Sequence, residues 1–199
     1  MFFIRHFPAL CLFSLATLGQ AADWPTYQHD YARTGVARES LLAPFTDGWV
    51  HRSRHAPRPA WRGEAKWDGY NKVYDLKSRQ IFDYAYHPVI ADGLLYYGSS
   101  ADDKIYCLDA ATGKLTPNAV PTVAARPGQG PRHLAFHPEL DVVYADNEQG
   151  SSVTAFAFDP DDGTLRELQT VSTLPPGGHE GNSNAQLHLH PSGRFIYAS

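Results

Sequence analysis

Three residues near the middle of the chain have side chains suited to chemistry, namely Arg132, His133 and Glu148. They belong to the stretch GQGPRHLAFHPELDVVYADNE, in which a Gly/Pro-rich turn precedes one predicted strand and Asn147 and Glu148 end the next. A guanidinium stays charged and binds anions through several donors, whereas a carboxylate or an imidazole can transfer protons. Arg132 and Glu148 are sixteen positions apart, so a rigid sheet could bring them together. The stretch therefore predicts a site at strand ends.

The elements that must position these residues are short strands. Pro88 to Ala91, the pair Asp92-Gly93 and Leu94 to Tyr97 have the pattern of strand, two-residue turn and strand. Ile105 to Leu108 predicts a third strand, and the turn from Asp109 to Leu115 leads into a fourth. Helical periodicity is hard to find, and aromatic residues, Gly and Pro are frequent. We therefore predict an all-β domain.

An internal repeat of about 50 residues indicates the architecture. Asp109 and Gly113 recur as Asp159 and Gly163, each 50 residues further on. Such a period with four short strands fits the blade of a β-propeller. A single blade cannot bury both its faces, and repetition supplies the neighbour that each blade needs. We predict an incomplete propeller of about three to four blades, each of four antiparallel strands.

A His-Pro pair also recurs, at His87, His137 and His190, in steps of 50 and 53 residues. We interpret it as a turn former that is repeated in three blades. His137 is therefore predicted to serve blade architecture rather than chemistry.

Residues 1–21 have the layout of a secretory signal peptide. Arg5 and His6 precede an apolar run from Phe7 to Leu18, and small residues follow up to Ala21, after which we expect cleavage. The run is too short to span a membrane as a helix. We predict a periplasmic or secreted protein with about 178 residues after cleavage. Cys107 would then be the single cysteine, so no disulfide within the chain is expected. The net charge of −4 argues against general affinity for nucleic acid or anionic membranes.

Residues 115–199 resemble the lactonase family of seven-bladed propellers, which includes 6-phosphogluconolactonases. The motifs that carry the resemblance stand in the family's order: GPRH, the FHP turn, the NE strand end, and HPSGRF followed by Tyr197 and Ser199. The resemblance implies hydrolysis of a small-molecule lactone or sugar acid derivative.

Residues 22–114 instead resemble exported propellers of the pyrroloquinoline-quinone (PQQ) repeat type. The opening DWPTYQHDYARTG and the run YYGSSADDKIYCLDAATGKL carry this resemblance. The two patterns meet in the DAATGKL turn, which is common to both, and the 50-residue phase continues through it. We expect one continuous domain of hybrid origin, arising from a natural fusion or from gene assembly.

The lactonase resemblance implies roles for particular residues. Arg132 and Glu148 match residues proposed to act in the family, with Arg132 on the developing anion and Glu148 as base or acid. We add His133 as a catalytic candidate, and Asn147 and His188 as substrate-binding candidates. The family also uses a histidine from an earlier blade and an arginine just after the final strand, which have no match before Ser199. We therefore expect little lactonase activity from this polypeptide alone.

No metal site is predicted. The acidic run from Asp159 to Gly163 is compatible with calcium but lacks the glutamate that closes an EF-hand loop, so a hairpin turn is the simpler interpretation. His188 and His190 lie two apart on a predicted strand and could join His179 or Glu180 around Zn²⁺ or Cu²⁺, but no third ligand has diagnostic spacing. No cofactor is implied by the lactonase resemblance, whereas a quinoprotein would bind PQQ with Ca²⁺. A third possibility is a scaffold whose open blade edges recruit a protein partner.

Overall fold

The structure is a computed structural model that describes residues 22–40, 43–44, 48–58, 85–114, 122–178 and 182–199. The expected signal peptide lies outside these residues. These residues form ten strands and no helix. The described part of the chain therefore contains no helical segment that could cross a membrane. The predicted all-β class is confirmed.

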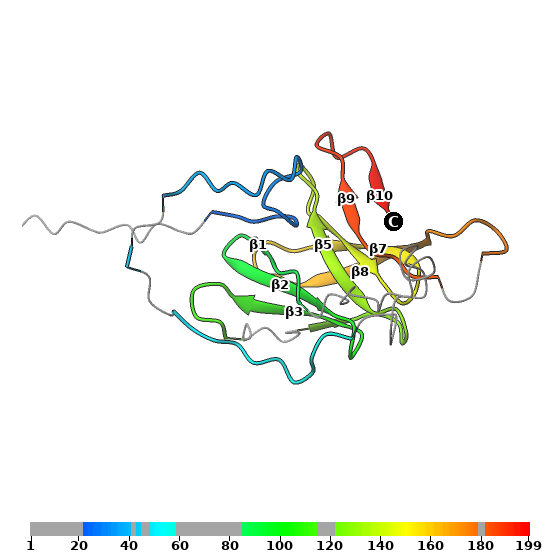
Figure 1. Cartoon of the computed structure of the whole chain (residues 1–199), viewed down its shortest axis with the longest axis horizontal. Coiled ribbons are helices and arrows are strands. Elements are labelled where there is room, and N and C mark those ends of the chain that lie inside the picture. The colour runs from blue at the N-terminus through cyan, green and yellow to red at the C-terminus, as the bar shows by residue number, and fades with distance from the viewer. Residues whose placement is uncertain (1–21, 41–42, 45–47, 59–84, 115–121, 179–181) are drawn as a thin grey trace, which may run out of the picture.

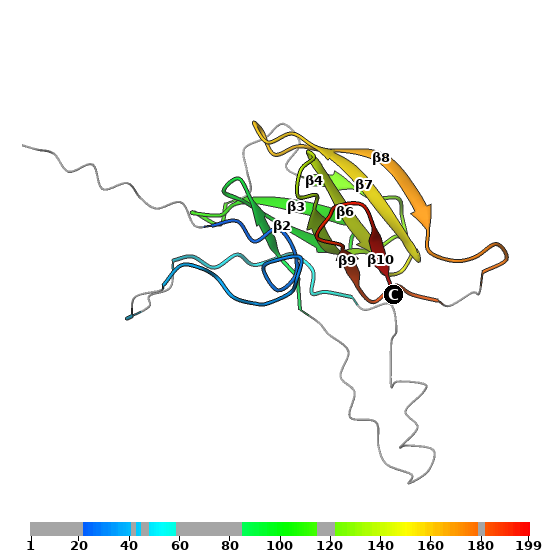
Figure 2. The ribbon, with the colours of Figure 1, turned by 90° about the horizontal axis from the view of Figure 1, so that it is seen from above.

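Eight of the strands form two four-stranded antiparallel sheets. Blade 1 consists of β1 (Val89–Ala91), β2 (Leu94–Ser99), β3 (Lys104–Asp109) and β4 (Thr122–Ala124), hydrogen-bonded in that order. Blade 2 consists of β5 (Pro131–Phe136), β6 (Val142–Asn147), β7 (Ser152–Phe158) and β8 (Leu165–Ser172), again in chain order. A third, two-stranded sheet pairs β9 (Leu187–Leu189) with β10 (Ile196–Ala198). The first strands β1, β5 and β9 lie side by side (Figure 1). Figure 2 shows β9 and β10 beside β6 of blade 2.

The 50-residue repeat corresponds to two equivalent turns, one after β3 and one after β7. After β3 the amide of Gly113 donates to the Asp109 carbonyl at 2.8 Å, and after β7 the amide of Gly163 donates to the Asp159 carbonyl at 2.7 Å. Both glycines have positive φ, +66° and +72°, a conformation that costs little without a Cβ. The repeat therefore marks equivalent third strands of two blades, as predicted.

The His-Pro repeat is equivalent at two of its three positions. His137 follows β5 and its Nδ1 accepts hydrogen bonds from the amides of Glu139 and Leu140, while His190 follows β9 and its Nδ1 accepts from the amide of Ser192. Each therefore shapes the turn between the first two strands of its sheet. His87 instead precedes β1, whose hairpin turns at Asp92-Gly93, so the prediction was wrong for His87. The short hairpin of blade 1 replaces the longer His-Pro turn.

Two apolar layers hold the three sheets together. The larger lies between blades 1 and 2 and the smaller between blade 2 and the β9–β10 sheet. Strand alternation makes β5 serve both layers, because Leu134 and Phe136 join the first and Ala135 joins the second. Aromatic rings fill the first layer, where Phe136 and Phe158 are 5.1 Å apart between centroids and Tyr96 packs edge-on against both. The blades thus pack face to face.

A segment at the N-terminal end of the described chain pairs with the outer edges of the first strands. The amide and carbonyl of Trp24 exchange two 2.9 Å hydrogen bonds with Ile90 of β1. Two residues on, the Pro25 carbonyl accepts from the amide of Phe136 in β5 at 3.0 Å. Residues 24–26 therefore satisfy backbone groups at the edges of both blades (Figure 1).

The same segment continues to the third sheet. The Tyr31 hydroxyl donates to the Phe136 carbonyl at 2.7 Å, and the Arg33 guanidinium donates to the Leu187 carbonyl of β9. His188 of β9 contacts the Tyr31 carbonyl through Nε2 at 3.2 Å. Residues 24–33 therefore tie the first strands of all three sheets together.

Gly98 of β2 packs closely against the backbone at the start of β5. A Cβ at this position would lie 2.6 Å from the Pro131 carbonyl oxygen and 2.8 Å from the Arg132 amide nitrogen. Both atoms are backbone, so no side-chain rotation can relieve the contact. The absence of a side chain at Gly98 therefore allows blade 1 to pack closely against the backbone of Pro131 and Arg132.

We expect Gly98→Ala to lower the free energy of unfolding by about 2 kcal/mol, as overpacking of a close contact does. Urea denaturation followed by tryptophan fluorescence measures it. Gly48→Ala is the matched control, because a Cβ at Gly48 meets nothing within 4 Å. Equal stability of the two variants would contradict the proposed close approach.

Candidate functional site

Arg132 and Glu148 form a largely buried ion pair. Nη1 of Arg132 donates to Oε1 of Glu148 at 2.9 Å, and the two side chains are 14% and 8% exposed. The predicted proximity of these two residues is confirmed. A pair so shielded from water interacts more strongly than a surface pair.

A β-bulge and two glycines position Arg132. The register between β5 and β6 shifts between Pro131 and Leu134, which places Arg132 and His133 in the irregular part of the strand. Before the strand, Gly128 and Gly130 both have positive φ. Bulges often turn side chains toward sites at sheet edges, and this one presents Arg132 to Glu148.

Asp103 of blade 1 anchors the loop that precedes Arg132. Its two carboxylate oxygens accept hydrogen bonds from the amides of Gly128 and Gly130, at 2.9 and 2.7 Å. The turn between β2 and β3 therefore fixes the entry to β5 of the neighbouring blade. Sequence reasoning missed Asp103, since its partner glycines lie more than twenty residues away.

Glu148 is held through its backbone from two sides. Its amide donates to the Gly130 carbonyl at 3.0 Å, and its carbonyl accepts from the amide of Asn184 at 3.0 Å. The Asn184 side chain also donates to the Ser152 carbonyl at 3.1 Å and accepts from the Thr173 hydroxyl at 2.8 Å. The segment before β9 thus holds the turn that carries Glu148.

Asp146 is a third charged residue of the site, and sequence reasoning missed it. Its side chain is fully buried, two residues before Glu148 on β6. Burial raises the pKa of Asp146 to about 7; the Asn184 side chain opposes this, Glu148 adds to the rise, and Arg132 lowers it. One N–H of the Asn184 side-chain amide donates to the Ser152 carbonyl, and within the described residues neither Asp146 oxygen has a hydrogen bond of good geometry. An acidic residue inside the apolar strand VVYADN was the available signal.

His133 lies within a group of aromatic rings. It is 6% exposed, and its ring stacks on His87 with centroids 4.3 Å apart and planes at 23°. Tyr27 of the N-terminal segment packs edge-on against both, at 5.4 Å from His87 and 6.0 Å from His133. A direct chemical role for His133 stays a prediction.

Asn147 is fully buried inside blade 2. Its Nδ2 donates to the hydroxyls of Ser152 and Thr154 of β7, at 3.0 and 2.8 Å. These bonds fix the β6–β7 hairpin next to Glu148. Substrate binding by Asn147 stays a prediction and would have to use Oδ1, because Nδ2 is occupied.

His188 lies on β9, where it contacts the Tyr31 carbonyl, and its substrate contact also stays a prediction. His190 lies beyond the strand end, in the turn described above, rather than on the same strand face as His188. His179 and Glu180 lie outside the described residues. Among the residues that the structure does describe, no group of three or more His, Cys, Asp or Glu side chains could hold a metal ion.

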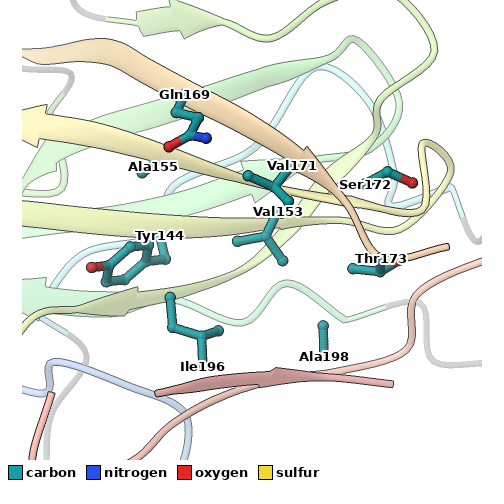
Figure 3. A pocket seen from close by; sticks show the side chains of 9 residues that line it. All are labelled: Tyr144, Val153, Ala155, Gln169, Val171, Ser172, Thr173, Ile196 and Ala198. Carbon is teal, nitrogen blue, oxygen red and sulfur yellow. The ribbon is translucent and has the colours of Figure 1, made fainter. Parts of the chain in front are cut away.

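A separate groove of about 340 Å³ lies between blade 2 and β10. Figure 3 shows Tyr144 and Val153 on one side and Ile196 and Ala198 on the other. Its lining includes none of the charged residues described above, so we assign the chemistry to the ion pair.

The arrangement can act on a carbonyl compound. A carboxylate can remove a proton from water, and a guanidinium with five donors can bind a carboxylate while other N–H groups stabilise a developing oxyanion. Hydrogen bonds from neighbouring sheets hold the backbone that carries Arg132 and Glu148 in place.

Comparison with known proteins places this site in a family context. The family description "Lactonase, 7-bladed beta-propeller" matches residues 100–199, about half of the chain. The 6-phosphogluconolactonase of Pectobacterium carotovorum subsp. carotovorum (strain PC1) is 37% identical over 99 residues, which cover 49% of this chain and 30% of the relative. That of Bacillus subtilis (strain 168) is 35% identical over 97 residues, 49% of this chain and 27% of the relative. The chain thus spans less than a third of these relatives' length.

Solved structures agree on the fold. A protein from Lactobacillus plantarum superposes with a TM-score of 0.53 and 25% identity, covering 58% of this chain and 34% of the other. The periplasmic gluconolactonase of Pseudomonas aeruginosa superposes with a TM-score of 0.52 and 25% identity, covering 58% and 33%. These likenesses support the interpretation of the four-stranded sheets as propeller blades.

Proposed function

Because the chain belongs to the lactonase family of seven-bladed β-propellers, we propose that it takes part in the hydrolysis of a sugar-acid lactone at Arg132 and Glu148. The observation that carries the proposal is the buried 2.9 Å ion pair, formed by two residues that the lactonase resemblance singles out. Relatives named 6-phosphogluconolactonase support the substrate class.

In the proposed mechanism Glu148 removes a proton from a water molecule as that water attacks the lactone carbonyl carbon. Arg132 stabilises the negative charge that develops on the carbonyl oxygen. When the tetrahedral intermediate collapses, the bond between the carbonyl carbon and the ring oxygen breaks. The ring oxygen takes the proton from Glu148, and the product is the open hydroxy acid.

The test is turnover of a 6-phosphogluconolactone by the purified chain, corrected for spontaneous hydrolysis. We expect weak turnover, because two side chains supply only part of a hydrolytic site. Glu148→Gln should reduce this turnover at least about 100-fold, since general base catalysis contributes that much. Glu167→Gln is the matched control, because the carboxylate of Glu167 on β8 pairs with the exposed side chain of Arg126. Equal rates for wild type and Glu148→Gln would overturn the proposal.

We also propose that the protein is exported. The apolar run in residues 1–21 supports this, as does the likeness to a periplasmic gluconolactonase. Cell fractionation followed by N-terminal sequencing tests it, with a mature protein that begins at Ala22 as the expected product.

The alternative is a PQQ-type propeller segment over residues 22–114 that acts as part of a quinoprotein or as a scaffold. The sequence YYGSSADDKIYCLDAATGKL supports the first form, and titration with PQQ and Ca²⁺ tests it by a spectral change. Exposed Leu168 and Val171 on β8 support the second, because apolar side chains on an edge strand favour a protein partner. Sedimentation at rising protein concentration tests it.

A further inference from the structure

Asp146 occupies a position that a packed propeller blade would ordinarily give to an apolar side chain. It pairs with Val153 in the β6–β7 register, and it is fully buried. Placing an ionised carboxylate there costs free energy unless hydrogen bonds or an opposite charge compensate. The charge of a carboxyl group buried in this way acts strongly on the ionisable groups beside it.

The ionisable groups beside Asp146 are Arg132 and Glu148, the ion pair of the proposed site. Within the described part of the chain, the charges that act on Asp146 are Glu148, in the turn that follows β6, and Arg132 of β5. Asn184, from the segment before β9, is a polar neighbour of Asp146. Asp146, Arg132 and Glu148 are therefore three largely buried ionisable side chains that interact electrostatically, one of them cationic and two of them carboxyl groups.

The protonation of Asp146 decides the net charge of this group. With Asp146 neutral, Arg132 and Glu148 balance each other. With Asp146 ionised, the three groups carry one negative charge in a region with little water to screen it. Since the lactone carbonyl becomes an oxyanion during reaction, the extra negative charge opposes the reaction.

We propose that Asp146 is a positioning residue that keeps the Arg132–Glu148 pair electrically neutral while it holds its proton, and that its ionisation switches the site off. The proposal rests on the proposed function for its reaction and adds a regulation of the same site. Asp146 is too buried to touch substrate and acts through Arg132 and Glu148. The raised pKa of Asp146, about 7, puts the switch near neutral pH.

The experiment compares wild type, Asp146→Asn and Glu167→Gln as full 199-residue chains. Asparagine reproduces the shape and neutrality of the protonated acid and cannot ionise. For wild type and Glu167→Gln, kcat/KM should fall about tenfold for each pH unit above 7, since one deprotonation removes the active form. For Asp146→Asn, kcat/KM should be constant over the same range. A purely structural role for Asp146 would leave the pH profile unchanged.

Two measurements do not depend on turnover. Infrared difference spectra between pH 6 and pH 8, both about one unit from the raised pKa, should show loss of a protonated carboxyl band in wild type and Glu167→Gln but not in Asp146→Asn. Binding of 6-phosphogluconate as an anionic probe should weaken over the same range in wild type and Glu167→Gln but not in Asp146→Asn. If turnover is absent while these two differences appear, lactone hydrolysis fails and the charge-setting role stands. If Asp146→Asn keeps the wild-type band and pH dependence, the inference is overturned.

Discussion

Arg132→Met is expected to lower the free energy of unfolding by about 3 kcal/mol, because it removes the guanidinium from a buried carboxylate. The Arg132 and Glu148 side chains are 14% and 8% exposed, so water cannot replace the lost partner well. Methionine keeps most of the side-chain length, which limits the effect of lost packing. Urea denaturation at neutral pH measures the loss.

A double-mutant cycle separates the ion pair from other effects. Arg132→Met with Glu148→Gln should recover much of the lost stability, since no unbalanced charge remains. The matched cycle uses Arg126 and Glu167, whose side chains are 69% and 33% exposed at a 3.2 Å separation. An exposed pair of this kind should show a coupling of about 0.5 kcal/mol or less. Similar couplings in the two cycles would mean that burial does not strengthen the Arg132–Glu148 pair.

Relative to wild type, the free energy of unfolding of Asp146→Asn is expected to rise by about 4 kcal/mol between pH 4 and pH 8. The pKa of Asp146 is about 7 in the folded protein, against an ordinary value of 3.8. A raised carboxyl pKa means that the folded state binds the proton more tightly. Its contribution to stability is therefore full below pH 4 and is lost as the pH rises toward 7. Above pH 7 the wild type carries a buried charge that the variant lacks.

The measurement is the difference in unfolding free energy between Asp146→Asn and wild type at several pH values. That difference should shift in favour of the variant from pH 4 to pH 8. Glu139→Gln provides a control for the loss of a carboxylate, since Glu139 is exposed and lies between β5 and β6 of the same blade. A difference that is independent of pH would show that Asp146 ionises in the folded protein as it does in the unfolded chain.

The sequence by itself determined the local elements. The Asp92-Gly93 pair set the β1–β2 hairpin, and the Asp109 and Asp159 turns, each with a glycine at positive φ, set the repeat. These features depend on dihedral preferences and hydrogen bonds within a few residues, which a sequence displays directly. The proximity of Arg132 and Glu148 was also predictable, since adjacent antiparallel strands with short turns bring their ends together.

Only the tertiary structure decided what surrounds that pair. The register shift that turns Arg132, the Asp103 carboxylate that holds its loop, and the burial of Asp146 all depend on contacts between sheets. The use of residues 24–33 to tie together three first strands is likewise invisible in sequence, because each hydrogen bond joins positions far apart in the chain. A carboxyl group's pKa and a strand's exact neighbours follow from packing and desolvation, and these exist only once the blades lie face to face.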